Sequence, residues 1–402
     1  MPSRVTCCIP MIALLLHAES LCAADYHAHF QKAVEWVNEA TGAELAISLE
    51  VRAVDKDELR ASAGTGISVS PVAMFDKRKK LLVVNPNACR AGLFITVRTT
   101  KEMDDVLLVL LLHEVLHAYQ ATILDQHPNI GLPPRLLRAL CEGHAITFSE
   151  AIAKAHGITT SITKNICPPD EMPFNLNSDT RRASLLRHFT YTLGTRCVAG
   201  RIGNVRHFDT LLDGTITYAS FSEQHPQPVT QPTTAATAAA TEISPPSQRA
   251  LPIRHIEDSI KAGMAGYVIG TSPIDYLDAM AVLAPACFEL PAVNHAFKSA
   301  VCIKARHDSS MLNIYVTSFA DEAIAKDLFE QCHTYFAHGI PAKDGRVMPS
   351  REDRLTWQVQ TQRVIIAARL RSGVIVFIEG ADRDRDVIEK LLVLQEQDRL
   401  RQ

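Results

Sequence analysis

The sequence has no CxxC pair among its 10 cysteines, which argues against a zinc site built from thiolates. It has no long basic stripe, and its formal net charge is −3, so nothing predicts a nucleic-acid partner. Beyond the N-terminus we find no stretch long enough and free enough of charge to span a bilayer, and no internal repeat. What remains is a chain of 402 residues, 47% hydrophobic and 21% charged, a balance that lets most of it bury a core.

The N-terminus has the pattern of an export signal. Arg4 supplies a positive charge, residues 5–18 are mostly apolar, and Ala23 and Ala24 are small residues suited to cleavage. We expect residues 1–23 to be removed and the mature chain to be exported, to a periplasm or the extracellular space, without a stable membrane span. An uncleaved leader acting as a membrane anchor is the alternative. An odd number of cysteines then remains, which implies at least one thiol that is free or paired with another molecule.

Apolar periodicity predicts an α+β fold. We expect a small N-terminal antiparallel sheet packed on the helix that carries an HExxH motif and on a second helix, followed by a small C-terminal α+β unit. The expected strands of the first sheet are Leu45–Val54, Ile67–Phe75, Leu81–Val84 and Leu93–Val97. The expected helices before the C-terminal unit are Tyr26–Ala40, Lys101–Gln126, Pro134–His156, Arg181–Val198 and Asn204–Leu212.

A shift in composition divides the chain. Residues 224–252 are rich in Pro, Thr and Ala and cannot bury enough apolar surface to fold alone. We therefore expect a first domain over 24–223, a linker over 224–252 and a second domain over 253–402. Within the second domain we expect helix over Ile256–Leu283, then strand, helix, hairpin and helix over Leu312–Ser318, Asp321–Phe336, Val364–Glu379 and Asp384–Gln397.

The stretch LLLHEVLHAYQ, Leu110–Gln120, sets two histidines and a glutamate in a run of leucines. Four residues apart on a helix, His113 and His117 share one face, where two imidazoles can bind one zinc ion. Glu114 projects about 100° round the axis from His113, so it can act as a base without being a ligand. The apolar neighbours predict a buried helix, and buried imidazoles are costly unless something pairs with them. A buried His–Glu ion pair is the alternative to zinc.

A catalytic zinc site needs a third protein ligand. Position 123, where an extended HExxH pattern would place a third histidine, is Ile123. The next candidates are Glu142, 25 residues after His117, and His144, which points about 200° away from Glu142 on the same helix. We favour Glu142, because two histidines and one glutamate are a common catalytic set. Gly143 costs about 1 kcal/mol relative to alanine inside a helix, and we expect it to permit a close approach of the two ligand-bearing helices.

The two segments resemble a known family. His113-Glu-Val-Leu-His-Ala-Tyr-Gln120 and Cys141-Glu-Gly-His-Ala145 are similar to the metal-binding helices of the gluzincins, the thermolysin-like zinc metalloproteases. The similarity is greatest to the small bacterial minigluzincin-type group. It is specific over Lys101–Ile152 and weak elsewhere, in residues 189–226, 321–329 and 363–380.

The resemblance implies a zinc metallopeptidase acting on a peptide or protein. His113, His117 and Glu142 would bind Zn²⁺, and Glu114 would be the general base. The family also implies an oxyanion donor, for which Tyr191 and His225 stand in the matching later segment. The strand expected before the active helix would bind an extended substrate by edge pairing.

One position departs from the family pattern. Thermolysin-like enzymes often carry an aspartate four residues after the ligand glutamate, where it orients a histidine, and here that position is Ile146. The orienting group must come from elsewhere. The carboxylates that could supply it are Asp104, Asp105 and Glu150.

Two other functions fit the same pattern. The chain could be a non-catalytic zinc-containing binding protein, a pseudoprotease that acts through its C-terminal domain, or a zinc hydrolase that cleaves non-peptide amides. Glu114 favours catalysis, because a binding module has no need of a buried base beside the ligands.

Overall fold

The computed structural model describes residues 26–52, 73–86, 100–128, 130–160, 175, 177–221, 253–285, 291–340, 345–347, 353–359 and 363–397. The chain forms two compact units, Met1–Asp170 with Arg187–Pro228, and Glu171–Leu186 with Val229–Gln402. The first domain expected from the sequence ran unbroken to residue 223, whereas residues 171–186 group with the C-terminal unit. The leader at 1–23 and the linker at 224–252 lie outside the described residues.

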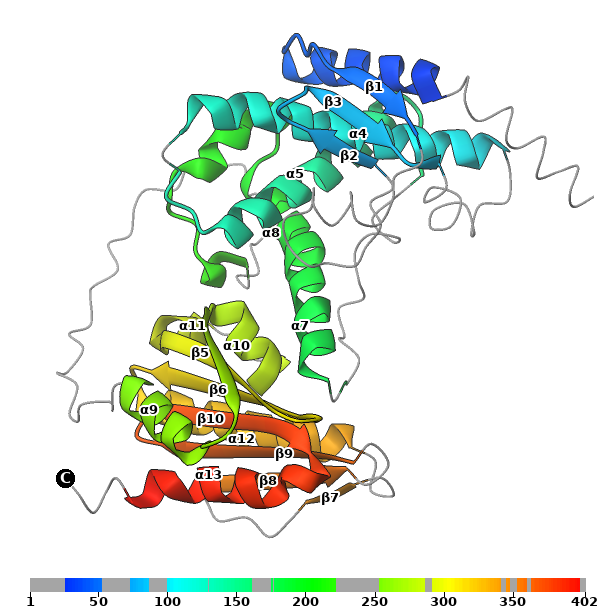
Figure 1. The fold of residues 1–402 in the computed structure, drawn as a ribbon. Helices are drawn as coiled ribbons and strands as arrows, with labels where there is room; N and C mark the ends of the chain where they lie inside the picture. Colours follow the sequence, from blue (N-terminus) through cyan, green and yellow to red (C-terminus); the bar gives the residue numbers. More distant parts are fainter. Residues whose placement is uncertain are drawn as a thin grey trace, which may run out of the picture. The chain divides into compact units, whose positions relative to one another are not determined.

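The N-terminal unit begins with a helix at residues 26–41 and a small sheet (Figure 1). Its strands are β1 (Ser48–Val51), β2 (Ala73–Asp76) and β3 (Leu81–Val84), in the order β1-β3-β2. β2 and β3 are antiparallel, but β1 runs parallel to β3, so the expectation of a purely antiparallel sheet was wrong. A tight turn at Lys77–Lys80 joins β2 to β3, whereas the chain from β1 returns by a long connection, which allows parallel pairing. The strand expected at Leu93–Val97 lies outside the described residues.

Helix α4 (Thr100–Gln126) is the core of this unit, and it contacts both β2 and the following helix α5 (Pro134–Ala155). The segment Val106–Leu116 is buried almost all round. By length and composition Lys101–Gln126 could cross a membrane, so the expectation that no stretch beyond the N-terminus meets that criterion was wrong. Because 78% of its most apolar window is buried in protein, the leucine run serves as a core helix.

Four short helical elements complete the unit. A π-helical turn, η2 (His188–Leu193), continues into α8 (Gly194–Arg201), and two 3₁₀ segments follow, η3 (Val205–Leu212) and η4 (Tyr218–Phe221). Asn204 caps η3 with its side chain, which accepts a hydrogen bond from the backbone N–H of Arg206. The predicted helix Arg181–Val198 is thus helical throughout, but its middle residues form a π turn in place of α-helix. Such turns are often found at functional sites.

Helix α7 (Ser178–Arg187) begins this run, and most of it belongs to the C-terminal unit. The side chain of Arg181 in this helix is buried and donates hydrogen bonds to the carbonyls of Ala281 and Val282. Ser178 donates to the carboxylate of Glu379 at 2.5 Å. These polar contacts explain why a segment that lies within the first domain by sequence packs with the second.

The C-terminal unit is a seven-stranded antiparallel sheet with helices on both faces (Figure 1). The strand order is β4-β5-β6-β10-β9-β8-β7. The strands are β4 (Val268–Ile274), β5 (Phe297–His307), β6 (Ser310–Phe319), β7 (Gly345–Val347), β8 (Arg354–Val359), β9 (Val364–Arg371) and β10 (Val374–Ala381). The helices are α9 (Ile253–Gly263), α10 (Tyr276–Leu283), α11 (Pro291–Ala296), α12 (Glu322–Gly339), η6 (Asp382–Asp384) and α13 (Arg385–Gln397).

The alternation of side chains in β10 gives this sheet two apolar faces. Val376 and Ile378 join the cluster formed with α9 and α13, and Phe377 points the other way, where it meets Phe336 of α12 at 5.6 Å between ring centres. The hairpin predicted between β9 and β10 is confirmed, with its turn at Ser372 and Gly373. Both have positive φ, as a two-residue turn that matches strand twist requires.

One predicted helix in this unit was wrong. The stretch expected to be helical over Ile256–Leu283 divides into α9, strand β4 and α10. Gly266 has φ +90, which ends the first helix in a turn, and Pro273 would break a helix but is tolerated in an edge strand. β4 is that edge strand, and Asp275 caps the helix after it by accepting from the N–H of Asp278.

Candidate metal centre

Helix α4 presents two imidazoles to one point. The Nε2 atoms of His113 and His117 lie 3.1 Å apart, because residues four apart on a helix share a face. His113 is buried and His117 is half-buried. The ring planes are nearly perpendicular, at 88°, so the two Nε2 atoms converge while the rings do not stack.

Helix α5 adds a carboxylate at the same point. Oε2 of Glu142 lies 3.3 Å from Nε2 of His113 and 3.5 Å from Nε2 of His117. The three side chains therefore form a group able to bind a metal ion. The structure brings together the three ligands expected from the sequence.

The separations between the donor atoms fit a small tetrahedral cation. Bonds of 2.0–2.1 Å, which zinc makes to imidazole nitrogen and carboxylate oxygen, place tetrahedron corners about 3.3 Å apart. The three measured separations of 3.1, 3.3 and 3.5 Å bracket that value. The donor chemistry fits the same ion, because two imidazoles and one carboxylate leave the fourth corner open. Other divalent metals that accept nitrogen and oxygen ligands fit the same donor set.

Burial and mutual attraction shift the pKa values of these groups. Burial alone would lower the pKa of His117, but the carboxylate of Glu142, with smaller contributions from Glu114 and Gln120, raises the value to about 9. Burial opposes ionisation of Glu142, yet the two imidazoles hold its pKa well below the usual range. In the metal-free protein the cluster therefore binds a proton between His117 and Glu142, and a metal must displace it.

Glu114 lies beside this cluster without joining it. Only 9% of the residue is exposed, and its carboxylate interacts electrostatically with His117, His113 and Glu142. Burial raises the pKa of Glu114, and the neighbouring imidazoles offset only part of that rise. A carboxylate with raised proton affinity beside a metal position is suited to proton transfer.

His144 is not part of the cluster, and its two ring nitrogens are occupied elsewhere. Nδ1 lies 3.1 Å from Nε2 of Gln120, and Nε2 lies 3.0 Å from the carbonyl oxygen of Val205. Burial lowers the pKa of His144 to about 4, so the ring is neutral near pH 7. The geometry thus supports Glu142 over His144 as the third ligand.

An amide, and not a carboxylate, orients His117. Nδ1 of His117 lies 2.8 Å from Oε1 of Gln120. Among the described residues, the ring nitrogens of the two histidines contact none of the carboxylates considered for this role, and Asp104 instead lies 3.9 Å from His29. Nδ1 of His113 is buried with no hydrogen-bond partner in the described part of the chain. Sequence reasoning missed Gln120, although its place three residues after His117 puts it on the same helix face.

Gly143 permits a close helix approach, but to a different helix from the one expected. A Cβ atom on Gly143 would fall 2.2 Å from the carbonyl carbon and oxygen of Gly194, and one on Gly194 would fall 2.3 Å from the carbonyl oxygen of Ala139. Helix α5 therefore crosses α8 backbone to backbone at two glycines. The expectation that Gly143 admits α4 was wrong.

This crossing brings Tyr191 to the metal-binding group. Tyr191 lies in the π turn three residues before Gly194, and its phenol interacts electrostatically with Glu142, Arg138 and Glu114. Burial raises the pKa of Tyr191 to about 12, so it keeps its proton across the neutral range. His225, the other candidate donor, lies outside the described residues.

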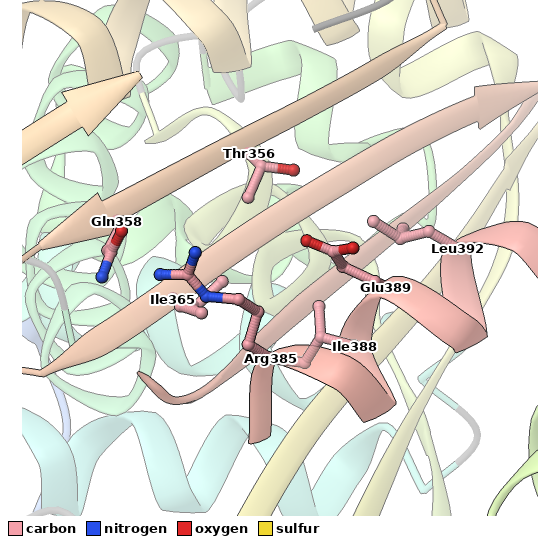
Figure 2. A pocket seen from close by; sticks show the side chains of 7 residues that line it. All are labelled: Thr356, Gln358, Ile365, Arg385, Ile388, Glu389 and Leu392. Carbon is pink, nitrogen blue, oxygen red and sulfur yellow. The ribbon is translucent and has the colours of Figure 1, made fainter. Parts of the chain in front are cut away.

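Two further hollows in the described part of the chain lie away from the metal-binding group, which lines neither of them. A groove of about 530 Å³ runs between the first helix and β1, lined by His27, Phe30 and Leu49 among others. In the C-terminal unit, β8, β9 and α13 enclose a hollow of only about 10 Å³, lined by Arg385 and Glu389 among others (Figure 2). A space of that size has room for about one water molecule, so it cannot take an organic ligand.

A scan of the chain against models of protein families found no match, and a search among curated proteins found none either.

Proposed function

We propose that this protein is an exported zinc metallopeptidase that cleaves peptide bonds in peptides or proteins. One observation carries the proposal: Glu114 is a buried carboxylate beside a set of three converging metal donors, yet it is not one of them. A structural or purely binding metal site does not need such a group, and burying a carboxylate is costly. A hydrolytic site needs it as the base.

His113, His117 and Glu142 would bind the ion, and the separations between their donor atoms support zinc. A bound zinc ion supplies Lewis-acid chemistry, which polarises a carbonyl oxygen and lowers the pKa of water. Glu114 accepts the proton of the attacking water and returns it to the leaving amine. Its raised proton affinity suits it to hold that proton between the two steps.

Tyr191 supplies a hydrogen-bond donor at the same site. Its phenol keeps its proton because burial raises the pKa to about 12, so it can donate to the oxygen that becomes negative in the transition state. A preorganised donor of this kind is worth about 10²–10³ in kcat. Arg138 lies four residues before Glu142 on α5, and its interaction with the phenol positions that donor.

Export follows from the leader pattern over residues 1–23 and is part of the proposal. The resemblance of His113–Gln120 and Cys141–Ala145 to gluzincins supports the reaction class. Cleavage of an unstructured protein by the purified mature chain tests the function. Wild type should cleave the substrate, chelation should abolish cleavage, and Glu114→Gln should lower kcat by about 10²–10⁴ while keeping the metal. Metal-loaded wild type without cleavage of any protein or peptide substrate would favour a binding role instead.

A further inference from the structure

We propose that His144, which is not a ligand, is a positioning residue for the metal centre: through Gln120 it fixes the ring of His117 with its Nε2 lone pair directed at the metal. The proposal rests on the metal site of the proposed function, and not on peptide hydrolysis. Three hydrogen bonds connect His117 through Gln120 and His144 to the backbone of η3, and a fourth anchors the Gln120 amide to the carbonyl of Cys141.

The carbonyl of Cys141 fixes the orientation of the Gln120 amide. Nε2 of Gln120 lies 2.7 Å from the carbonyl oxygen of Cys141. A carbonyl oxygen can only accept, so the amide group that faces it must be the NH₂. The reversed amide would place two oxygens at that distance. Gln120 is 1% exposed, which leaves water no access to offer an alternative partner.

The orientation of this amide determines which ring nitrogen carries the hydrogen in His117 and in His144. Because the amide oxygen of Gln120 can only accept, Nδ1 of His117 carries the hydrogen at the 2.8 Å contact. The second hydrogen of the NH₂ is donated to Nδ1 of His144 at 3.1 Å. His144 therefore carries its proton on Nε2, which donates to the carbonyl of Val205 at 3.0 Å. Each donor in the chain has one acceptor.

The hydrogen on Nδ1 determines which nitrogen of His117 can bind a metal. With its hydrogen on Nδ1, the neutral ring has its only lone pair on Nε2, the atom that faces His113 and Glu142. Without an acceptor at Nδ1, the ring is free to rotate and to carry its hydrogen on Nε2, which cannot bind a metal. Partners of this kind typically change metal affinity about 10–100-fold.

Aromatic packing and a backbone hydrogen bond hold the ring of His144 in place. Its ring lies 4.8 Å from the ring centres of both Phe148 and Phe208, and it is 0% exposed. The aromatic walls exclude water, and Val205 fixes the remaining ring nitrogen. His144 is thus a rigid, neutral acceptor for the Gln120 amide.

The two halves of the His144 ring can be tested separately. Asparagine places its side-chain oxygen where Nδ1 of His144 stands, so His144→Asn keeps an acceptor for Gln120 and loses the bond to Val205. Glutamine reaches the position of Nε2, so His144→Gln keeps the bond to Val205 and leaves Gln120 unsupported. Ser149→Ala is the matched control, because it removes a buried hydroxyl from the same helix that donates to the carbonyl of Ile146.

The experiment measures the Kd of each full-length variant for Zn²⁺ alone, by competition with a chelator, together with the thermal unfolding of the metal-free protein. His144→Gln should bind zinc about 10–100-fold more weakly than wild type, and His144→Asn and Ser149→Ala should stay near the wild-type value. Equal affinity in the two His144 variants would overturn the proposal, whether both fall or neither does, because a purely structural role moves both alike. Wild type without zinc binding would overturn the metal site as well.

A measurement on wild type guards against variants that do not fold. Nitrogen NMR of ¹⁵N-histidine-labelled, zinc-loaded protein reports which ring nitrogen of each histidine carries a hydrogen. His117 should carry it on Nδ1 and His144 on Nε2. A hydrogen on Nδ1 of His144 would contradict the proposal.

Discussion

Gly143 of α5 and Gly194 of α8 lie backbone against backbone, so that a Cβ atom on the first would fall 2.2 Å from the carbonyl of the second. This contact joins two parts of the site. It fixes α5, which carries Glu142 one residue earlier, against the chain that carries Tyr191 three residues before Gly194.

Gly143→Ala tests the contact. The added methyl group must push two backbones apart, and overpacking of this kind costs about 1–3 kcal/mol or more. We expect the temperature of thermal unfolding of the metal-free protein to fall by roughly 2–12 °C and zinc affinity to fall with it. The control is Gly203→Ala, because a Cβ there meets nothing within 4 Å. A Gly143→Ala protein as stable as the control would contradict the assigned crossing.

Tyr191→Phe removes a hydrogen-bond donor without removing a metal ligand. If the phenol stabilises the developing oxyanion, kcat should fall about 10²–10³-fold, while zinc content and KM change little. Because the pKa of Tyr191 is about 12, its ionisation should not shape the pH profile between pH 6 and 10. Steady-state kinetics on one peptide substrate gives both readouts. An unchanged kcat would remove Tyr191 from the mechanism.

The pH dependence of metal affinity follows from His117. Its pKa is raised from 6.5 to about 9 in the metal-free protein, so zinc competes with a proton below that value. Apparent affinity should rise by about tenfold per pH unit from pH 6.5 to near 9 and then level off. Isothermal titration at several pH values measures this slope, and a flat profile below pH 8 would contradict it.

The raised pKa of His117 also determines how the stability of the metal-free protein changes with pH. A pKa that is raised on folding contributes stability that is fully present below pH 6.5 and is lost as the pH rises through about 9. The metal-free protein should therefore lose stability over that interval. Glu142→Gln removes the charge that raises the pKa, so it should show a smaller loss in the same denaturant titrations.

Much of the fold followed from local patterns in the sequence. The apolar run of α4, the proline that opens α5 and the apolar runs of β6, β9 and β10 each depend on neighbours in the chain, and these elements were predicted. The parallel pairing of β1 with β3 and the division of Ile256–Leu283 were not. Strand direction depends on partners far along the chain, and Gly266 ends α9 only because its backbone adopts positive φ.

Part of the site was likewise predictable from local sequence, and part of it was not. His113, Glu114 and His117 follow from helix periodicity, and Glu142 from the chemistry of the donor set. The roles of Gln120 and His144 depend on which side chains meet across α4 and α5, and the role of Gly143 depends on α8, some 50 residues later. A signal for that contact existed, because Gly194 also stands inside a predicted helix, but its partner could not be identified from one sequence.

The zinc content of the purified mature chain, measured by native mass spectrometry, tests the central claim most directly. Wild type and Glu114→Gln should each carry one zinc ion, Glu142→Ala should carry none, and His144→Ala should still fill at saturating zinc. Wild-type protein without metal would contradict the account, and a filled Glu142→Ala beside an empty His144→Ala would show that the third ligand is His144.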